Sequence, residues 1–248
     1  MPNLPKVALI TGAAKRIGAE VARHLHAANF NLIIHYHHSE PEALSLADEL
    51  NAARENSALT IKADLNDQDQ LNALAKQASE QWQGLSLLVN NASSFYPTPF
   101  DKASESDWED LIGSNLKAPY FLAQALAPAL TAAAGCIINI ADIYAEKPLR
   151  NHIIYSIAKA GNLMLTKSLA QELAPRVRVN GIAPGAILWP EQADKLSDED
   201  KEKMLAKIPL QQRGQAQDIA KAIMYLVKDA PYVTGQVLTV DGGRSLTI

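Results

Sequence analysis

Short apolar runs alternate with longer amphipathic stretches along the whole chain. A run of β-branched and apolar residues bounded by glycine, proline or polar residues predicts a buried strand. Seven runs have this character, at residues 6–10, 31–35, 59–62, 85–89, 136–140, 176–182 and 236–240. Apolar residues at helical spacing predict helices between them. These are expected at residues 19–28, 41–55, 67–83, 107–130 (bent near Pro119 and Pro128), in the segment that carries Tyr155, and at 218–227.

This alternation predicts an α/β fold, a Rossmann-like, doubly wound parallel sheet with helices on both faces. No shift of composition, repeat or low-complexity linker divides residues 1–248, so we expect a single domain. The polar stretch 189–212 is expected to form a short helix pair over a cleft. Ligands of such sheets bind beyond the carboxyl ends of the strands. The candidates at those ends are Gly12, His37, Asp64, Asn91, Asp142 and Pro184.

Composition removes several classes of function. The 248 residues carry a net charge of -4, which offers no global field for nucleic acid or an anionic membrane, so neither is expected as a partner. Cys136 is the only cysteine, which excludes an intrachain disulfide and a cysteine-based metal site. The apolar runs are shorter than a membrane span, and residues 1–12 show no signal-peptide pattern. We therefore expect a cytoplasmic protein.

The first strand is followed by TGAAKRIG, residues 11–18. Gly12 lets the backbone turn and approach a ligand closely. The helix that follows presents free N–H groups and a positive dipole end to a pyrophosphate, and Lys15 and Arg16 add charge there. Arg16 stands where a G-x-G-x-x-G motif has its middle glycine. The turn predicts a phosphate-binding site.

The second strand runs into HYHHS, residues 35–39. An acidic residue near this point accepts a hydrogen bond from the ribose of NAD, whereas basic groups suit the 2′-phosphate of NADP. His37, His38 and Ser39 therefore favour NADP, against the opposing charge of Glu40; the alternative is a solvated loop. We expect His35 and His37 on one strand face and His38 on the other. No cysteine or carboxylate completes a ligand set, so no metal is expected.

Tyr155 and Lys159 are four residues apart, which places both on one helix face, about 6 Å apart along the axis. An ammonium beside a phenol is expected to lower the phenol pKa and to make it a proton donor and acceptor near neutral pH. An ordinary helix pair is the alternative. Asp142 reaches them only if the chain folds back; otherwise it is a cap or a turn residue. Phe95 lies in a loop, where it either stacks on a flat heteroaromatic ring or anchors the loop.

In their order along the chain, these motifs resemble the short-chain dehydrogenase/reductase family. The resemblance covers nearly the whole length and rests on Gly12 with Gly18, Asp64-Leu65, Asn91-Ala92, Asn115, Tyr155-x-x-x-Lys159, Pro184-Gly185 and Asp241-Gly242-Gly243. The family usually has glycine at positions 16 and 93, serine at 142 and often threonine at 189. This chain has Arg16, Ser93, Asp142 and Trp189.

The first three departures resemble the pteridine reductase branch of that family. In the same branch the loop after the fourth strand reads NNASSFYPTP, which stands complete at residues 90–99 here. His38 differs, because the protozoan members tend to have arginine there. The resemblance implies NADPH-dependent hydride transfer to a ring C=N of a pterin or dihydropterin of the biopterin type, with folate and dihydrofolate as further candidates.

The resemblance also implies roles for individual residues. The catalytic set is Asp142, Tyr155, Lys159 and Asn115, with Asn115 binding a water behind Lys159. The cofactor set is Gly12, Lys15, Arg16, Ile17, His37, His38, Ser39, Asp64, Leu65, Asn91, Ala92, Ser93, Tyr155, Lys159, Pro184, Gly185 and Ile187. The substrate set is Arg16, Ser93, Phe95, Asp142, Tyr155 and Leu188, with residues 189–212 covering the substrate. A homotetramer built on residues 111–130 and 156–172 is the expected assembly.

Two other functions remain open. A carbonyl reductase of the 3-oxoacyl type is disfavoured by Trp189 and by Asp142, whose carboxylate would repel a developing alkoxide. A non-catalytic NADP(H) sensor is disfavoured because it would not need Asn115, Tyr155 and Lys159 together.

Overall fold

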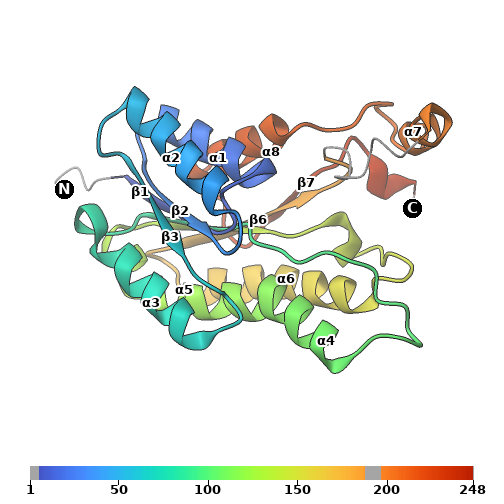
Figure 1. Cartoon of the computed structure of the whole chain (residues 1–248), viewed down its shortest axis with the longest axis horizontal. Helices are drawn as coiled ribbons and strands as arrows, with labels where there is room; N and C mark the ends of the chain where they lie inside the picture. Colours follow the sequence, from blue (N-terminus) through green and yellow to red (C-terminus); the bar gives the residue numbers. More distant parts are fainter. Residues whose placement is uncertain (1–5, 188–196, 248) are drawn as a thin grey trace.

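The computed structural model describes residues 6–187 and 197–247. Within them, seven strands form one parallel sheet in the order β3-β2-β1-β4-β5-β6-β7 (Figure 1). The chain builds outward from β1 to β3, returns to the centre at β4 and builds outward again to β7, so the order reverses between β1 and β4. The strands are β1 (Val7–Ile10), β2 (Asn31–Tyr36), β3 (Ala58–Lys62), β4 (Leu87–Asn90), β5 (Cys136–Ile140), β6 (Arg178–Pro184) and β7 (Val237–Val240).

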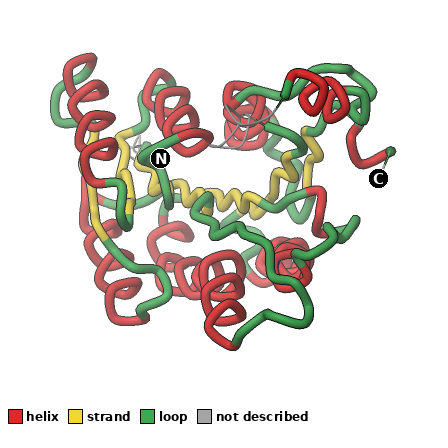
Figure 2. The backbone as a smooth tube through the Cα atoms, turned by 45° about the vertical axis from the view of Figure 1, so that its right-hand side comes forward, coloured by secondary structure: helices red, strands yellow, loops and turns green. Residues whose placement is uncertain are grey.

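Helices cover both faces of the sheet, and Figure 2 shows the strands as a layer between two helical layers. In Figure 1, α1, α2 and α8 lie on one face and α3, α4, α5 and α6 on the other. The described α-helices are α1 (Arg16–Ala27), α2 (Glu40–Ala53), α3 (Gln68–Glu80), α4 (Glu105–Ile112), α5 (Ala118–Ala132), α6 (Ile153–Glu172), α7 (Asp198–Leu205) and α8 (Ala216–Met224). None of them is both long and apolar enough to cross a membrane.

Two apolar cores explain why the strands read as continuous apolar runs. Alternate side chains of one strand enter opposite faces of the sheet. In β1, Ala8 and Ile10 pack into the core under α1 and α2, while Val7 and Leu9 pack into the core that contains residues of α3 and α5. All four are fully buried, as expected for a parallel sheet covered on both sides. The predicted fold is therefore confirmed.

The predicted helix over residues 107–130 is two helices joined by a π-helical turn. Ser104 starts α4 with a capping box, accepting from the Asp107 N–H, so this helix begins before the predicted position. The π turn is Gly113–Lys117, and Pro119 lies in the first turn of α5, where its missing N–H costs little. Pro128 lies inside α5. The π turn matters because it carries Asn115.

A second π turn, Tyr225–Asp229, ends the predicted helix over residues 218–227. The short 3-10 turns are Gln81–Gln83, Ile143–Ala145 and Arg244–Leu246. Of the predicted covering segment 189–212, only residues 197–212 are described, and they contain α7. The expected helix pair is thus tested only in part.

Candidate active site

The turn between β1 and α1 is held close against the end of β4. Gly12 has φ +61°, a left-handed conformation that favours glycine, and a Cβ there would lie 2.9 Å from the Ala92 Cα. The Asn91 side-chain amide donates to the carbonyl oxygens of Thr11 (2.9 Å) and Gly12 (3.0 Å). The N-cap residue of α1, Lys15, makes no side-chain capping hydrogen bond, and the first N–H groups of a helix have no partner within the helix.

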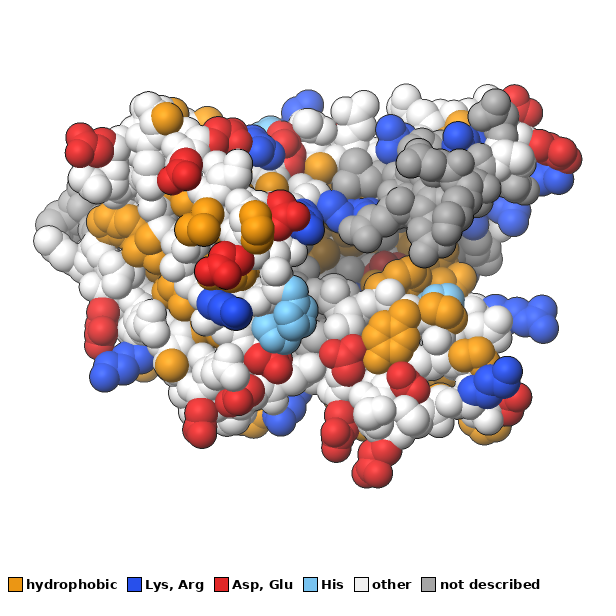
Figure 3. Space-filling model, viewed as in Figure 1, with side chains coloured by type: hydrophobic (Ala, Val, Ile, Leu, Met, Phe, Trp, Pro, Cys, Tyr) orange, Lys and Arg blue, Asp and Glu red, His pale blue; other side chains and the backbone are white. Residues whose placement is uncertain are grey.

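A cleft of about 600 Å³ opens at this point, beyond the carboxyl ends of the central strands. Figure 3 shows the hollowed middle of this face, with histidine side chains at its edge. A glycine turn, a helix N-terminus and a long cleft at the point where strand order reverses fit a dinucleotide. The cleft brings together twelve predicted cofactor residues, Gly12, Lys15, Arg16, Ile17, His37, His38, Ser39, Asp64, Leu65, Asn91, Ala92 and Ser93.

The histidines of the HYHHS segment divide into two groups. His35 is 2% exposed; its Nδ1 accepts from the Gly12 N–H (3.1 Å) and its Nε2–H donates to the Ala63 carbonyl (3.0 Å). Burial lowers its pKa to about 4. It therefore ties β2 to the glycine turn and to β3 as a neutral group. The expectation that His38 points away from His37 is wrong, because their rings lie side by side, with centroids 3.6 Å apart and planes tilted by 30°.

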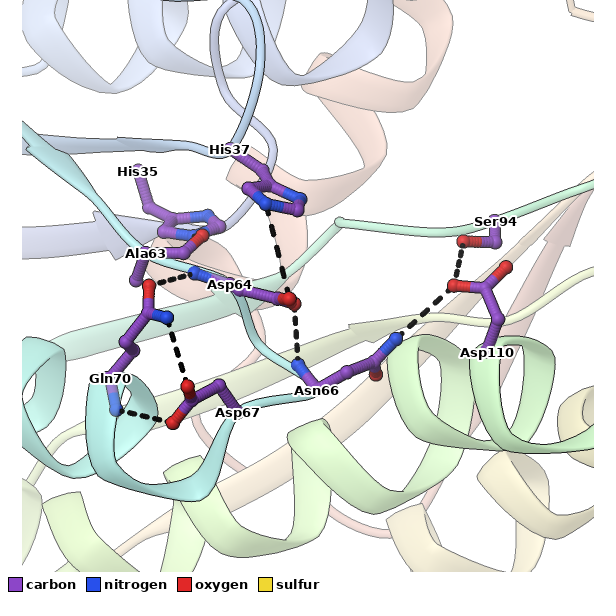
Figure 4. Close-up of polar contacts among 9 residues, drawn as sticks. All are labelled: His35, His37, Ala63, Asp64, Asn66, Asp67, Gln70, Ser94 and Asp110. Atoms are coloured by element: carbon purple, nitrogen blue, oxygen red, sulfur yellow. Dashed lines mark hydrogen bonds and ion pairs between the residues drawn. The ribbon is translucent and has the colours of Figure 1, made fainter. Parts of the chain in front are cut away.

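Two polar connections around the cleft involve residues that the sequence did not single out. The Lys15 ammonium pairs with Glu42 of α2 at 2.7 Å, so part of its charge is already neutralised. On the far side, the Asp64 carboxylate accepts from the Asn66 N–H (2.9 Å), and Asp110 accepts from the side chains of Asn66 and Ser94, both at 3.1 Å (Figure 4). These residues come from separate elements, so no local pattern could have grouped them.

Asp142 and Tyr155 are in direct contact. After β5 the chain folds back, and the Tyr155 hydroxyl donates to the Asp142 Oδ2 at 2.8 Å. The other oxygen, Oδ1, accepts from the Tyr144 N–H at 2.8 Å, so Asp142 is also the cap of a 3-10 turn. Burial raises the pKa of Asp142, opposed by both hydrogen bonds and by Lys159.

The predicted lowering of the Tyr155 pKa is wrong for the protein by itself. Burial and the Asp142 carboxylate raise the Tyr155 pKa well above its usual value. Lys159 is 5.6 Å from the Tyr155 ring centroid and donates to the Ile140 carbonyl at 2.8 Å. Burial lowers the Lys159 pKa to about 8, opposed by Asp142. The phenol is therefore protonated at neutral pH and is a proton donor beside a buried cation.

Asn115 lies on the inner side of the π turn. Its side-chain amide donates to the Leu111 carbonyl (2.9 Å), and its Oδ1 accepts from the Ser93 hydroxyl (2.6 Å). Its main-chain carbonyl accepts from the Asn162 side chain at 3.0 Å. Within the described residues no hydrogen bond joins Asn115 to Lys159, so its role in holding a water stays a prediction. Asn162 was missed, although it is a polar residue on the inward face of α6, three positions after Lys159.

Phe95 lies beside Tyr155. It is 54% exposed, and its ring meets the Tyr155 ring edge-on, with centroids 4.8 Å apart. His152, another missed residue, stacks on Phe95 at 4.9 Å and 16°. Pro184 ends β6, and the Gly185 N–H donates to Val240 (3.0 Å). The predicted residue Leu188, like Trp189, lies outside the described residues.

Comparison with known proteins agrees with this geometry. A family model described as enoyl-(acyl carrier protein) reductase matches residues 12–245. Pteridine reductase 1 of Leishmania tarentolae is 37% identical, covering 99% of this chain and 98% of its own. The 3-oxoacyl-[acyl-carrier-protein] reductase FabG of Staphylococcus aureus strain N315 is also 37% identical, covering 97% and 98%. The chain belongs to the short-chain dehydrogenase/reductase family.

As a member of this family, the protein is an NAD(P)-dependent oxidoreductase. No group of three histidine, cysteine or acidic side chains placed to hold a metal occurs in residues 6–187 and 197–247. The cleft floor and the turn before α1 fit a dinucleotide, which supplies the hydride when it is bound.

Proposed function

We propose that this protein is an NADPH-dependent pteridine reductase, which reduces a ring C=N bond of a pterin or dihydropterin. The observation that carries the proposal is the 2.8 Å hydrogen bond from the Tyr155 hydroxyl to the Asp142 carboxylate. Ketone reduction places negative charge on an oxygen next to the proton donor, and a carboxylate there would repel it. Reduction of C=N instead leaves a ring nitrogen that needs a proton.

The hydrogen-bonded pair Tyr155 and Asp142 can supply the proton that such a substrate needs. Tyr155 keeps its proton at neutral pH because its pKa is raised, and it can donate that proton to a ring nitrogen. Once Asp142 has taken a proton from solvent, which its raised pKa favours, it can pass that proton to the phenolate through the existing hydrogen bond. The Lys159 ammonium stabilises the phenolate in between. Each residue thus holds or moves a proton at a defined atom.

Phe95 supports a flat substrate. A loop aromatic that is 54% exposed and touches the proton donor offers a stacking surface for a heteroaromatic ring. The segment NNASSFYPTP, residues 90–99, resembles the corresponding loop of pteridine reductases. We infer a preference for NADPH from His37, His38 and Ser39 at the end of β2, where an NAD site commonly has an acidic residue.

A carbonyl reductase of the 3-oxoacyl type is the second candidate, because the Staphylococcus aureus relative of that name matches at the same 37% identity. The experiment that separates the two follows NADPH oxidation with dihydrobiopterin, folate and an acetoacetyl thioester in parallel. Turnover of the pterin supports the proposal. Turnover of the acetoacetyl compound alone selects the second candidate, and cofactor binding without any turnover makes the protein a sensor.

We also propose that the protein acts as a cytoplasmic homotetramer. The packed pair α4 and α6 carries exposed apolar side chains, with Trp108 at 46%, Ile157 at 45% and Met164 at 62% exposed, which would be covered by another subunit. Light scattering on the purified protein tests the assembly, because a monomer in solution would refute it.

A further inference from the structure

Phe95 presents its ring from an irregular loop that follows β4. The side chain is 54% exposed, and residues 91–97 belong to no helix or strand. His152 stacks on one face of the ring, with centroids 4.9 Å apart, which leaves the opposite face for a ligand. Because such a loop lacks the hydrogen bonds of a regular element, its side chains keep one position only where neighbouring residues are held.

Ser94, directly before Phe95, is held by α4 and by the π turn that follows it. Its hydroxyl donates to the Asp110 carboxylate at 3.1 Å (Figure 4). Its N–H donates to the Ser114 hydroxyl at 3.2 Å, and its carbonyl accepts from the Asn115 side chain at 3.0 Å. Every polar group of Ser94 is thus bonded to one continuous helical segment.

Tyr96, directly after Phe95, is anchored beside the same helix. Its ring packs against a small buried cluster formed by Leu111, Ile154 and Tyr155. Burial, together with the neighbouring carboxylates of Asp110 and Asp107, raises the pKa of Tyr96 to about 12. The Asp110 carboxylate therefore lies against the residues on both sides of Phe95.

The same carboxylate also holds the segment after β3. The Asn66 side chain donates to the Asp110 Oδ1 at 3.1 Å, and the Asn66 N–H donates to the Asp64 Oδ1 at 2.9 Å (Figure 4). A Cβ on Gly113 would clash with the Asn66 Oδ1, so glycine lets this side chain lie against the π turn. These residues line the cofactor cleft, where Asp110 joins the segment after β3 to the loop of Phe95.

We infer that Asp110 is a positioning residue for the substrate, which fixes the Phe95 ring by holding the residues on either side of it. The inference rests on the proposed function, in which a flat heteroaromatic ring stacks on Phe95. Stacking depends on the separation and tilt of the two rings, so a loop that is free to move binds such a substrate more weakly. Asp110 acts through Phe95, whose ring lies 4.8 Å from that of Tyr155.

Two substitutions separate the contacts of Asp110 from its charge. Asp110→Asn and Asp110→Ala lose the same negative charge, but only asparagine keeps an oxygen that can accept from Ser94 and Asn66. KM for dihydropterin should rise at least about fivefold in Asp110→Ala and less than about twofold in Asp110→Asn. The NADPH Kd, measured by calorimetry, should differ less than about twofold between these two variants. Glu109→Ala should behave as the wild type, because Glu109 is an exposed neighbour on α4 outside the cleft.

A double-mutant cycle tests whether Asp110 acts through Phe95. In a Phe95→Leu background, Asp110→Ala should raise KM for dihydropterin by less than about a further twofold. Ser94→Ala removes one contact and keeps the carboxylate, so it should raise this KM by about twofold to fivefold. This variant tests the same contact if Asp110→Ala does not fold.

Hydrogen exchange of the protein without ligands gives a readout that is independent of the substrate. Amides of residues 91–97 should exchange at least about threefold faster in Asp110→Ala than in the wild type, and at the wild-type rate in Glu109→Ala. The inference would be overturned by a wild-type KM in Asp110→Ala, or by an equal effect of Asp110→Ala with and without Phe95. The proposed function fails separately, if the wild type turns over neither dihydrobiopterin nor folate. Hydrogen exchange then decides whether Asp110 holds the loop, and wild-type exchange in Asp110→Ala would show that it does not.

Discussion

Replacing Asp142 tests the proton path most directly. In Asp142→Asn the side chain keeps its shape, and its remaining oxygen can still accept from the Tyr144 N–H, so the 3-10 turn keeps its cap. What is lost is the carboxylate that accepts the Tyr155 hydroxyl at 2.8 Å. Asp142→Ser removes the same charge with a shorter side chain that can also cap. Both variants therefore separate proton transfer from local structure.

The expected loss follows from this one contact. A hydrogen bond to a charged group contributes about 1.5–3 kcal/mol. Because about 1.4 kcal/mol corresponds to tenfold in rate, kcat/KM for dihydropterin should fall between about 10-fold and 150-fold in both variants. Since a carboxylate disfavours an alkoxide, turnover of an acetoacetyl thioester should not fall.

The pH profile gives an independent measurement. The Lys159 pKa is about 8, and the Asp142 charge holds it up against burial. Activity that needs the Lys159 ammonium should therefore decline as pH rises through about 8 in the wild type, and at lower pH in Asp142→Asn. The assay is steady-state NADPH oxidation across this range, with cofactor Kd and thermal unfolding as controls. Wild-type pterin turnover in both variants would refute the proton path.

Three further predictions concern the surrounding structure. The pKa of His35 is about 4 in the folded protein and about 6.5 in the unfolded chain. Its contribution to the free energy of unfolding is therefore complete above pH 6.5 and is lost as the pH falls toward about 4. In urea unfolding, the free energy of unfolding should fall by about 2 kcal/mol between pH 7 and pH 5, and by less in the His35→Gln variant. Gly12→Ala adds a Cβ 2.9 Å from the Ala92 Cα at a residue with positive φ, so it should lower the free energy of unfolding by about 1–2 kcal/mol or more. It should also weaken NADPH binding, which calorimetry measures. Unchanged NADPH binding would contradict the close approach of the turn to Ala92. Phe95→Leu should raise KM for the pterin about tenfold, by loss of stacking, and leave the cofactor Kd unchanged; an equal loss with both ligands would contradict the assigned surface.

Local patterns along the chain were sufficient for the fold and for part of the site. The strand runs lie within a few residues of the observed strands because a parallel sheet covered on both faces buries both sides of its central strands, which makes most of their residues apolar. Tyr155 and Lys159 were grouped by helical spacing, and the turn at Gly12 by its place after a strand. These features depend on residues close together in sequence.

The tertiary structure decided what depends on burial and on distant residues. Spacing alone predicted a lowered Tyr155 pKa, but burial and the charge of Asp142 raise it. The same desolvation makes His35 a neutral structural tie, where the sequence showed only one of three similar histidines. The stacking of His152 on Phe95 required the loop before α4 to lie against the start of α6. Periodicity in a sequence records which side of an element is buried, but the dielectric surroundings and charged neighbours of a group exist only once distant segments have packed together.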